Sequence, residues 1–238
     1  PRDRHAELFE KMATSKSKVV AFDILLSETA ETDIDARLAE AISENSNLYL
    51  PIHFVVPGSN GAEFDLKEPV SPIKEAAQGL GHVNLIFDSD GMVRRTSICF
   101  GDIDGRAWPH LMELAYRHAK GALSPAFARQ SDCNVRLLLP YAARGSFSTI
   151  SYAALVNGEM PLDFLRDKVV LIGATAQGLG DQHPVPMRDG GALAGVDMAE
   201  IAPWTDGEDL IALDSCNIEL NQTRFGDFER ADRVALVV

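Results

Sequence analysis

The sequence predicts an α/β fold: a mixed, mainly parallel sheet flanked by helices, with an antiparallel hairpin inserted into it. Strongly apolar, strand-like runs at residues 18–26, 48–56 and 168–175 alternate with helical patterns, and this alternation is typical of parallel sheets. The sequence from Asp88 to Gly91 (Asp-Ser-Asp-Gly) separates two further strand-like runs, and Asp-Gly at such a position is a strong hairpin signal.

Apolar periodicity and turn residues predict the remaining elements. Helices or helical turns are expected at residues 2–15, 32–44, 73–80, 108–119, 151–156, 162–166 and 195–201. Further strands are expected at residues 83–87, 92–100 and 135–141. Proline and glycine mark residues 57–72 and 176–194 as loops.

Residues 1–206 are expected to form one domain, because its length lies in the usual single-domain range and no internal repeat is visible. Residues 207–238 form a tail in which the pattern weakens. Within this tail, residues 232–238 are expected to supply a strand to the same sheet, beside residues 19–26 or 169–172. The run Val-Ala-Leu-Val-Val is too apolar to stay solvated without a partner.

The charge balance argues against a nucleic-acid partner. The chain has 238 residues and a formal net charge of −13, from 35 acidic and 22 basic residues. Its longest basic run is the pair Arg94–Arg95, whereas nucleic-acid binding needs a basic surface. No apolar run approaches the ~20 residues of a membrane helix, and no signal peptide is recognisable at the start.

No cofactor or metal is expected from the motifs. Cys99, Cys133 and Cys216 are odd in number, widely spaced and without a CxxC pair, so neither a zinc site nor a disulfide framework follows. The glycines after residue 172 lack the Lys and Ser or Thr of a phosphate-binding loop, and turns explain them more simply. Ser146 lacks the G-x-S-x-G context of a nucleophile.

Asp23 is the most informative single residue, because it interrupts an apolar strand where an unpaired charge is costly. Two interpretations are open. Asp23 is either an internal anchor, paired with an arginine such as Arg94 or Arg95 or with a cluster of backbone N–H groups, or part of a pocket. Such a pocket would lie at the carboxyl ends of the parallel strands, where open α/β sheets bind ligands.

The pocket hypothesis predicts a ligand site formed by Asp23, Ser27, Thr175 and Asp181. Asp23 and Ser27 follow one buried strand, while Thr175 and Asp181 follow another. Carboxyl ends of parallel strands share one edge of a sheet, and helix N-termini point to the same edge. A polar or anionic ligand is therefore expected there.

Five collinear segments resemble the second type of CHASE domain, a sensory extracellular domain of bacterial signalling proteins. They are residues 20–28 (VAFDILLSE), 81–84 (GHVN), 88–95 (DSDGMVRR), 145–152 (GSFSTISY) and 169–175 (VVLIGAT) running on to Gly178-Leu179-Gly180-Asp181. The likeness spans roughly residues 1–200.

The resemblance implies a sensor domain in the periplasm, outside the cytoplasmic membrane, that is not itself an enzyme. It implies flanking transmembrane helices and a cytoplasmic output, which in this family is an adenylate, guanylate or diguanylate cyclase, a histidine kinase or a Ser/Thr kinase. A homodimer and an unidentified small-molecule or protein signal are implied with it.

The chain departs from the family pattern at two places. Family members begin with a strand that ends in an acidic motif, and here residues 232–238 look most like that strand. Either the sequence joins segments out of their native order, or the tail supplies the strand by permutation. After Gly195-Val196-Asp197 the family tends to continue with His-Ala-Asn, whereas this chain continues with Met198-Ala199-Glu200.

Two other functions stay open at this stage. One is a small α/β hydrolase that uses Asp23, His82 or Asp181, and the other is a dimerisation domain without a ligand. The absence of a coherent nucleophile–base pair in the sequence favours the sensor.

Overall fold

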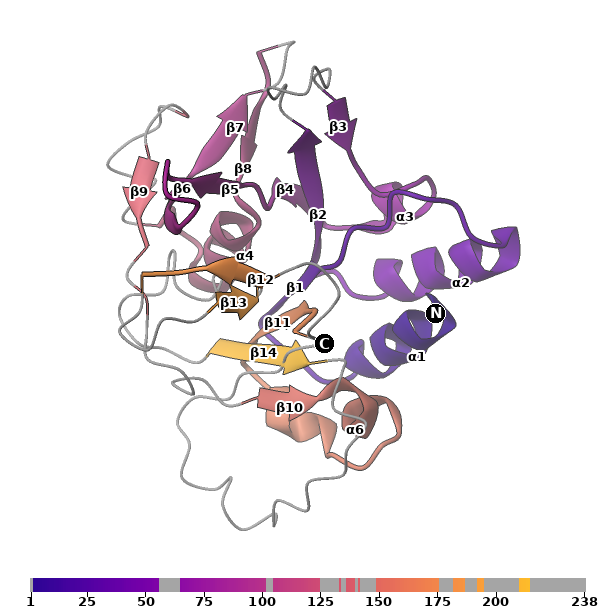
Figure 1. Ribbon diagram of the computed structural model, residues 1–238. Helices are drawn as coiled ribbons and strands as arrows, with labels where there is room; N and C mark the ends of the chain where they lie inside the picture. Colours follow the sequence, from indigo (N-terminus) through magenta and orange to yellow (C-terminus); the bar gives the residue numbers. More distant parts are fainter. Residues whose placement is uncertain are drawn as a thin grey trace.

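The computed structural model describes residues 2–55, 65–101, 105–124, 133, 136–139, 141, 149–175, 182–186, 192–194 and 210–214 (Figure 1). Its central feature is a seven-stranded sheet with the order β10-β14-β11-β1-β2-β3, in which β4 also pairs with β2. The strands are β1 (Val19–Asp23), β2 (Leu48–Val55), β3 (Asp65–Lys67), β4 (Gly79–His82), β10 (Thr149–Ser151), β11 (Val169–Gly173) and β14 (Leu210–Asp214). All pairs are parallel except β2 with β3. This confirms the predicted mainly parallel α/β sheet.

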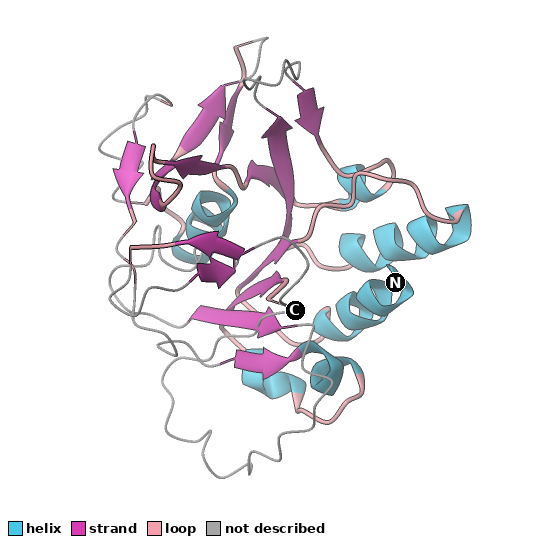
Figure 2. Ribbon diagram, viewed as in Figure 1, coloured by secondary structure: helices cyan, strands magenta, loops and turns pink. Residues whose placement is uncertain are grey.

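Helices cover both faces of this sheet (Figure 2). One face carries α1 (Arg2–Met12), α2 (Thr32–Ser43), the short α3 (Ile73–Ala76) and α6 (Tyr152–Val156), and the opposite face carries α4 (Leu111–Lys120). A 3-10 turn, η1 (Leu162–Leu165), precedes β11. Alternate residues of β1 serve the two faces, because side chains of a strand alternate in direction. Val20 and Phe22 pack with α1 and α2, whereas Val19 and Ala21 pack with α4.

The antiparallel hairpin is confirmed, but it belongs to a separate three-stranded sheet and not to the central one. It joins β5 (Leu85–Phe87) to β6 (Val93–Ser97), and β9 (Arg136–Leu138) pairs with β6 on the other side. Gly91 has a φ of 78°, in the left-handed region that favours glycine, and its N–H donates to the Asp88 carbonyl at 2.9 Å. Two smaller hairpins pair β7 (Cys99–Gly101) with β8 (Ala107–Pro109), and β12 (Gln182–Pro184) with β13 (Ala192–Ala194).

Three expected elements have different bounds because tertiary pairing overrides local propensity. The helix expected at residues 73–80 ends at Ala76, and Gly79–His82 is instead the strand β4, paired with β2. The helix expected at residues 108–119 begins at Leu111, because residues 107–109 pair with β7. The strand expected at residues 92–100 divides into β6 and β7.

Short strands also occur where no strand was expected. The loop expected at residues 57–72 contains β3, and the loop expected at residues 176–194 contains β12 and β13. Leu210–Asp214, within the expected tail, is a strand of the main sheet and pairs with β11. Three of these four strands have only three residues, too few for a periodic pattern to show.

Two expectations concern residues outside the described part of the chain: the helix at 195–201 and the strand at 232–238. The strands β1 and β11 pair with each other, and their other sides pair with β2 and β14 respectively. The division into residues 1–206 and a tail stays a prediction. None of the helices in the described part of the chain has the length and apolar character needed to cross a membrane.

Candidate functional site

The carboxyl edge of the central sheet brings two of the predicted ligand residues together. Asp23, the last residue of β1, stands in register with Gly173, the last residue of β11, and Thr175 follows two residues later. Asp23 and Thr175 are both partly buried. Ser27 lies four residues beyond β1 and is exposed, and Asp181 lies outside the described residues.

The two arginines that the anchor interpretation of Asp23 named pair with other carboxylates. Arg94 donates to Asp88 at 2.8 Å and makes two hydrogen bonds to Asp90, at 2.9 and 2.8 Å. Arg95 also pairs with Asp88. Both arginines therefore stabilise the hairpin that contains them. Asp23 also lies at the end of its strand rather than in the middle, which is where a partly solvated carboxylate costs least.

Sequence reasoning missed a histidine–tyrosine pair near the same edge. His5 of α1 packs edge-on against the ring of Phe22, the residue before Asp23, with the ring centroids 5.1 Å apart. Its Nδ1 lies 2.8 Å from the hydroxyl oxygen of Tyr152, which begins α6 directly after β10. The spacing of His5 and Phe9, one helical turn apart, was the available signal, because it places both residues on the face that packs on the sheet.

Burial sets the protonation states of this pair. It lowers the pKa of His5 to about 4, and the nearby Arg2 acts in the same direction. It also raises the pKa of the Tyr152 hydroxyl above its ordinary value. At neutral pH both side chains are therefore uncharged. They offer hydrogen-bonding groups without a charge.

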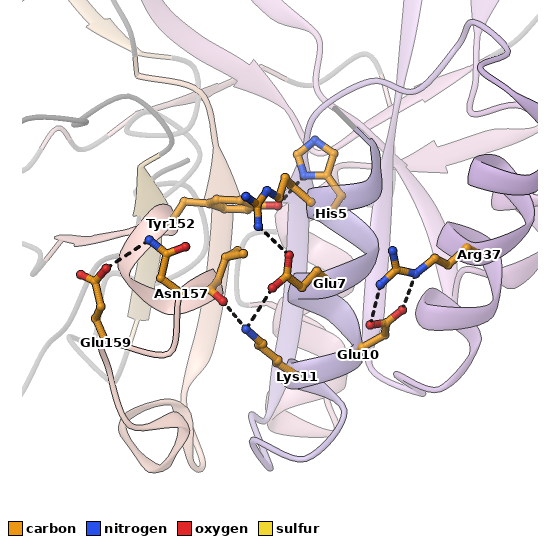
Figure 3. A network of polar contacts seen from close by, with 10 residues as sticks. His5, Glu7, Glu10, Lys11, Arg37, Tyr152, Asn157 and Glu159 are labelled. Carbon is orange, nitrogen blue, oxygen red and sulfur yellow. Dashed lines mark hydrogen bonds and ion pairs between the residues drawn. The ribbon is translucent and has the colours of Figure 1, made fainter.

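Polar contacts fix α1, and with it His5, between α6 and α2 (Figure 3). Lys11 donates to the Val156 carbonyl at the end of α6 and to Glu7 at 3.2 Å. On the other side, Arg37 of α2 makes two hydrogen bonds to Glu10, at 2.8 and 3.0 Å. Exposed ion pairs of this kind contribute only about 0–1 kcal/mol each. Their main effect is to set the position of α1.

A second set of contacts orders the segment that follows Ser27. The buried carboxylate of Asp35 pairs with Arg2 and accepts a hydrogen bond from the Ala30 backbone N–H at 2.9 Å. Arg2 also donates to the Glu28 carbonyl. The first turn of α1 and the segment after β1 are thus held together next to the carboxyl edge.

The described residues near this edge offer the Asp23 carboxylate, several hydroxyls and the neutral imidazole of His5, which suit hydrogen bonding to a polar molecule. Among the described residues, no three His, Cys, Asp or Glu side chains are grouped so as to hold a metal ion. His82, which the hydrolase alternative named beside Asp23 and Asp181, is fully buried on β4 and so cannot reach a substrate.

The segment Gly81–Asn84 has a clear structural role. A Cβ at Gly81 would lie 2.5 Å from the Cα of Leu111, so only glycine allows α4 to approach β4 this closely. The buried Asn84 side chain accepts from the Phe54 N–H at 2.9 Å and donates to the Phe54 carbonyl at 2.7 Å. This segment therefore locks β2, β4 and α4 together.

A disulfide joins Cys99 of β7 to Cys133, 34 residues later. The spacing of the cysteines alone did not indicate it. The Ser97 hydroxyl oxygen lies 2.6 and 2.9 Å from the carbonyl oxygens of Cys99 and Cys133, which share its single O–H donor. Cys216 lies outside the described residues. Disulfides persist in oxidising environments and are rare in the cytosol.

Comparison with known proteins identifies the same family as the five segments that resemble a CHASE domain of the second type. The family model of the CHASE2 domain matches residues 1–201. No curated protein and no solved structure matches the chain. CHASE2 domains are sensory and extracellular and are not catalytic, which supports a sensory role without enzyme activity in this chain. With the match covering most of its length, the chain belongs to the CHASE2 family of extracellular sensory domains.

Proposed function

We propose that this domain is the periplasmic input of a bacterial transmembrane receptor, flanked by membrane helices and homodimeric through the full-length protein. Its output is a cytoplasmic cyclase, a histidine kinase or a Ser/Thr kinase. Family membership supports the sensory role, and the Cys99–Cys133 disulfide supports an oxidising compartment such as the periplasm.

The observation that carries the ligand site is the register of β1 with β11. It aligns Asp23 with Gly173, and Thr175 follows directly from that strand end. In open α/β sheets, ligands bind beyond the carboxyl ends of the strands. Gln182 donates to the Thr175 carbonyl at 3.2 Å, so the chain returns to this edge at the residue after Asp181. We therefore assign Asp23, Ser27, Thr175 and Asp181 to one site.

The chemistry of this edge favours a polar ligand that carries both donors and an acidic group. The Asp23 carboxylate accepts hydrogen bonds from donors such as ammonium or hydroxyl groups. Negatively charged groups are stabilised near helix N-termini. His5, near the start of α1, packs on Phe22, and this contact places the N-terminal turn of α1 close to the edge.

The test is ligand-induced thermal stabilisation, with amino acids, dicarboxylates and sugar phosphates as probes. A probe that binds this site should stabilise the wild-type domain by about 2.7 kcal/mol when its free concentration is ~100 times its Kd. Asp23→Asn should abolish that stabilisation and leave the melting temperature of the free domain nearly unchanged.

Asp163→Asn is the matched control for this experiment. Asp163 is exposed and lies in η1, which leads into the opposite end of β11. This variant should respond to the probe as the wild type does. Equal stabilisation of Asp23→Asn and wild type would contradict the assignment of the site.

A further inference from the structure

Two buried histidines are in contact where the end of β4 packs against the start of α4. His82 ends β4 and forms an isolated parallel bridge with His110, the residue between β8 and α4. Their ring centroids are 5.0 Å apart with the rings nearly perpendicular, and Phe100 packs against His82 at 5.6 Å. Two imidazoles in contact inside a protein core raise the question of how their protonation is controlled.

Hydrogen bonding requires both rings to be neutral. The Nδ1 of His110 accepts from the Met112 backbone N–H at 3.2 Å and so caps α4. The Nδ1 of His82 accepts from the Asn84 backbone N–H at 3.3 Å. A backbone N–H can only donate, so each Nδ1 is unprotonated and each neutral ring carries its proton on Nε2.

Protonation would disrupt this junction in two ways. A proton on either Nδ1 removes the acceptor for a backbone N–H, and in His110 this acceptor is the N-cap of α4. Two positive rings 5.0 Å apart in a desolvated site would also repel each other. Nε2 of His82 has no hydrogen-bond partner among the described residues, so no carboxylate there compensates for a charge.

The surrounding ionisable groups do not favour a charged pair either. The elements packed around the junction carry the following ionisable groups: Asp23, Tyr49, His53, Arg94, Arg95, Arg106, Glu113, Tyr116, Arg117, His118 and Lys120. Of the two carboxylates in this set, Glu113 accepts from Arg117 at 2.8 Å and from the Ser124 N–H at 3.2 Å. The other, Asp23, ends β1, which β2 separates from β4 in the sheet. Burial is the main cause of the lowered pKa of His82. The charged forms of His110 and His53 lower this pKa further, whereas the Ser97 backbone acts in the opposite direction.

We propose that His82 and His110 form an acid-sensitive latch, which holds β4 against α4 when both rings are neutral and opens this junction when they are protonated. The latch also reaches the hairpin region, because the His110 N–H donates to the Ile98 carbonyl at 2.8 Å, next to the disulfide at Cys99. An extracellular domain meets the acidity of its surroundings directly. The latch converts that acidity into a local structural change.

The pH range follows from the two states of the rings. In the open junction the histidines regain their ordinary pKa of 6.5, whereas burial lowers the pKa of His110 to about 4 and that of His82 well below 6.5. The closed state is therefore fully favoured above pH 6.5 and loses its advantage as the pH falls. The opening constant should rise by up to about 100-fold per pH unit across this range, because two protons are taken up.

Amide hydrogen exchange of the 238-residue chain measures this opening directly. After correction for the intrinsic pH dependence of exchange, the Asn84 and Met112 amides should lose protection from about pH 6 downwards. Core amides of β1 and β11 should stay protected over the same range. A wild-type protein that keeps both latch amides protected to about pH 4.5, or exposes them only together with the core, overturns the proposal.

A double variant, H82N/H110N, tests the two side chains themselves. Asparagine keeps an acceptor for the N–H two residues on but does not titrate, so the pH-dependent loss of protection should disappear. H183N, which changes a histidine of β12 in another sheet, should behave as wild type. The same pH dependence in H82N/H110N as in wild type would overturn the latch.

A ring titration by NMR needs no variant and covers the case in which the double variant fails to fold. In the intact wild type at about pH 6, neutral His82 and His110 rings support the latch. Titration of both rings with ordinary pKa values, while the junction stays closed, refutes it.

Discussion

Loss of the Cys99–Cys133 disulfide should destabilise the domain by about 4 kcal/mol. The bridge closes a loop with a sequence separation of 34 residues. In the chain-entropy model, the conformational entropy that such a crosslink removes from the unfolded state amounts to about 4 kcal/mol at 25 °C. The Ser97 hydroxyl, which bridges the carbonyls of both cysteines, remains after reduction and should keep the two segments in contact in the native state.

The assay is urea unfolding with and without dithiothreitol, for the wild type and for C99S/C133S. Reduction should lower the wild-type midpoint to that of the double variant, and the double variant should not respond to reductant. C216S is the control and should keep the full response. Thiol titration of the unreduced, denatured wild type should find one free thiol among the three cysteines. Three free thiols, or a midpoint that ignores dithiothreitol, would refute the disulfide and remove its support for an oxidising compartment.

Three further predictions concern the packing of the core and the neutral state of the buried His5. Asn84→Ala should lower the free energy of unfolding by about 2 kcal/mol in a urea titration, since it removes two hydrogen bonds to buried backbone groups. The control is Asn157→Ala at an exposed position, which should change the free energy of unfolding by less than about 0.5 kcal/mol. Gly81→Ala should lower the free energy of unfolding by about 2 kcal/mol or more in calorimetry, because the new methyl meets the α4 backbone. Gly79→Ala should lower it less, because its methyl meets only side chains, those of Tyr49 and Leu114. Between pH 6.5 and pH 4, the wild type should take up about one more proton on unfolding than His5→Asn, because His5 is neutral only in the folded state. The free energy of unfolding of the wild type should therefore fall more steeply on acidification than that of His5→Asn, by up to about 1.4 kcal/mol per pH unit. Equal slopes for the two proteins would contradict a buried, neutral His5.

The parts of the fold that were predictable are those in which local pattern and tertiary structure agree. The apolar run at Val169–Gly173 forms a fully buried strand, as its composition requires. The hairpin at Gly91 follows from turn chemistry that is confined to a few neighbouring residues. In both cases the information is local, so one sequence is enough to read it.

The missed elements depend on partners far away in the sequence. Gly79–His82 has poor strand propensity and becomes a strand because β2 pairs with it, while Gly81 makes room for α4. The contact between His82 and His110 and the disulfide of Cys99 each join residues about thirty positions apart. No periodicity records such a pairing.

The sequence predicts only part of the candidate site, because some of its residues are placed by strand order and others by the packing of distant helices. Topology alone places the end of β1 beside the end of β11, so strand order is enough to predict that Asp23 and Thr175 follow neighbouring strand ends. The His5–Tyr152 pair was not, because it depends on how α1 lies across the sheet and against α6. Two separate helices must be positioned before these side chains meet.

The most direct test of the sensory site is amide chemical-shift mapping during titration with a probe that stabilises the domain. The amides of Asp23, Ser27 and Thr175 should shift together, with one dissociation constant, and the shifts should vanish in Asp23→Asn but persist in Asp163→Asn. Shifts that cluster elsewhere in the domain and leave the ends of β1 and β11 unchanged would contradict the claim that this sheet edge receives the signal.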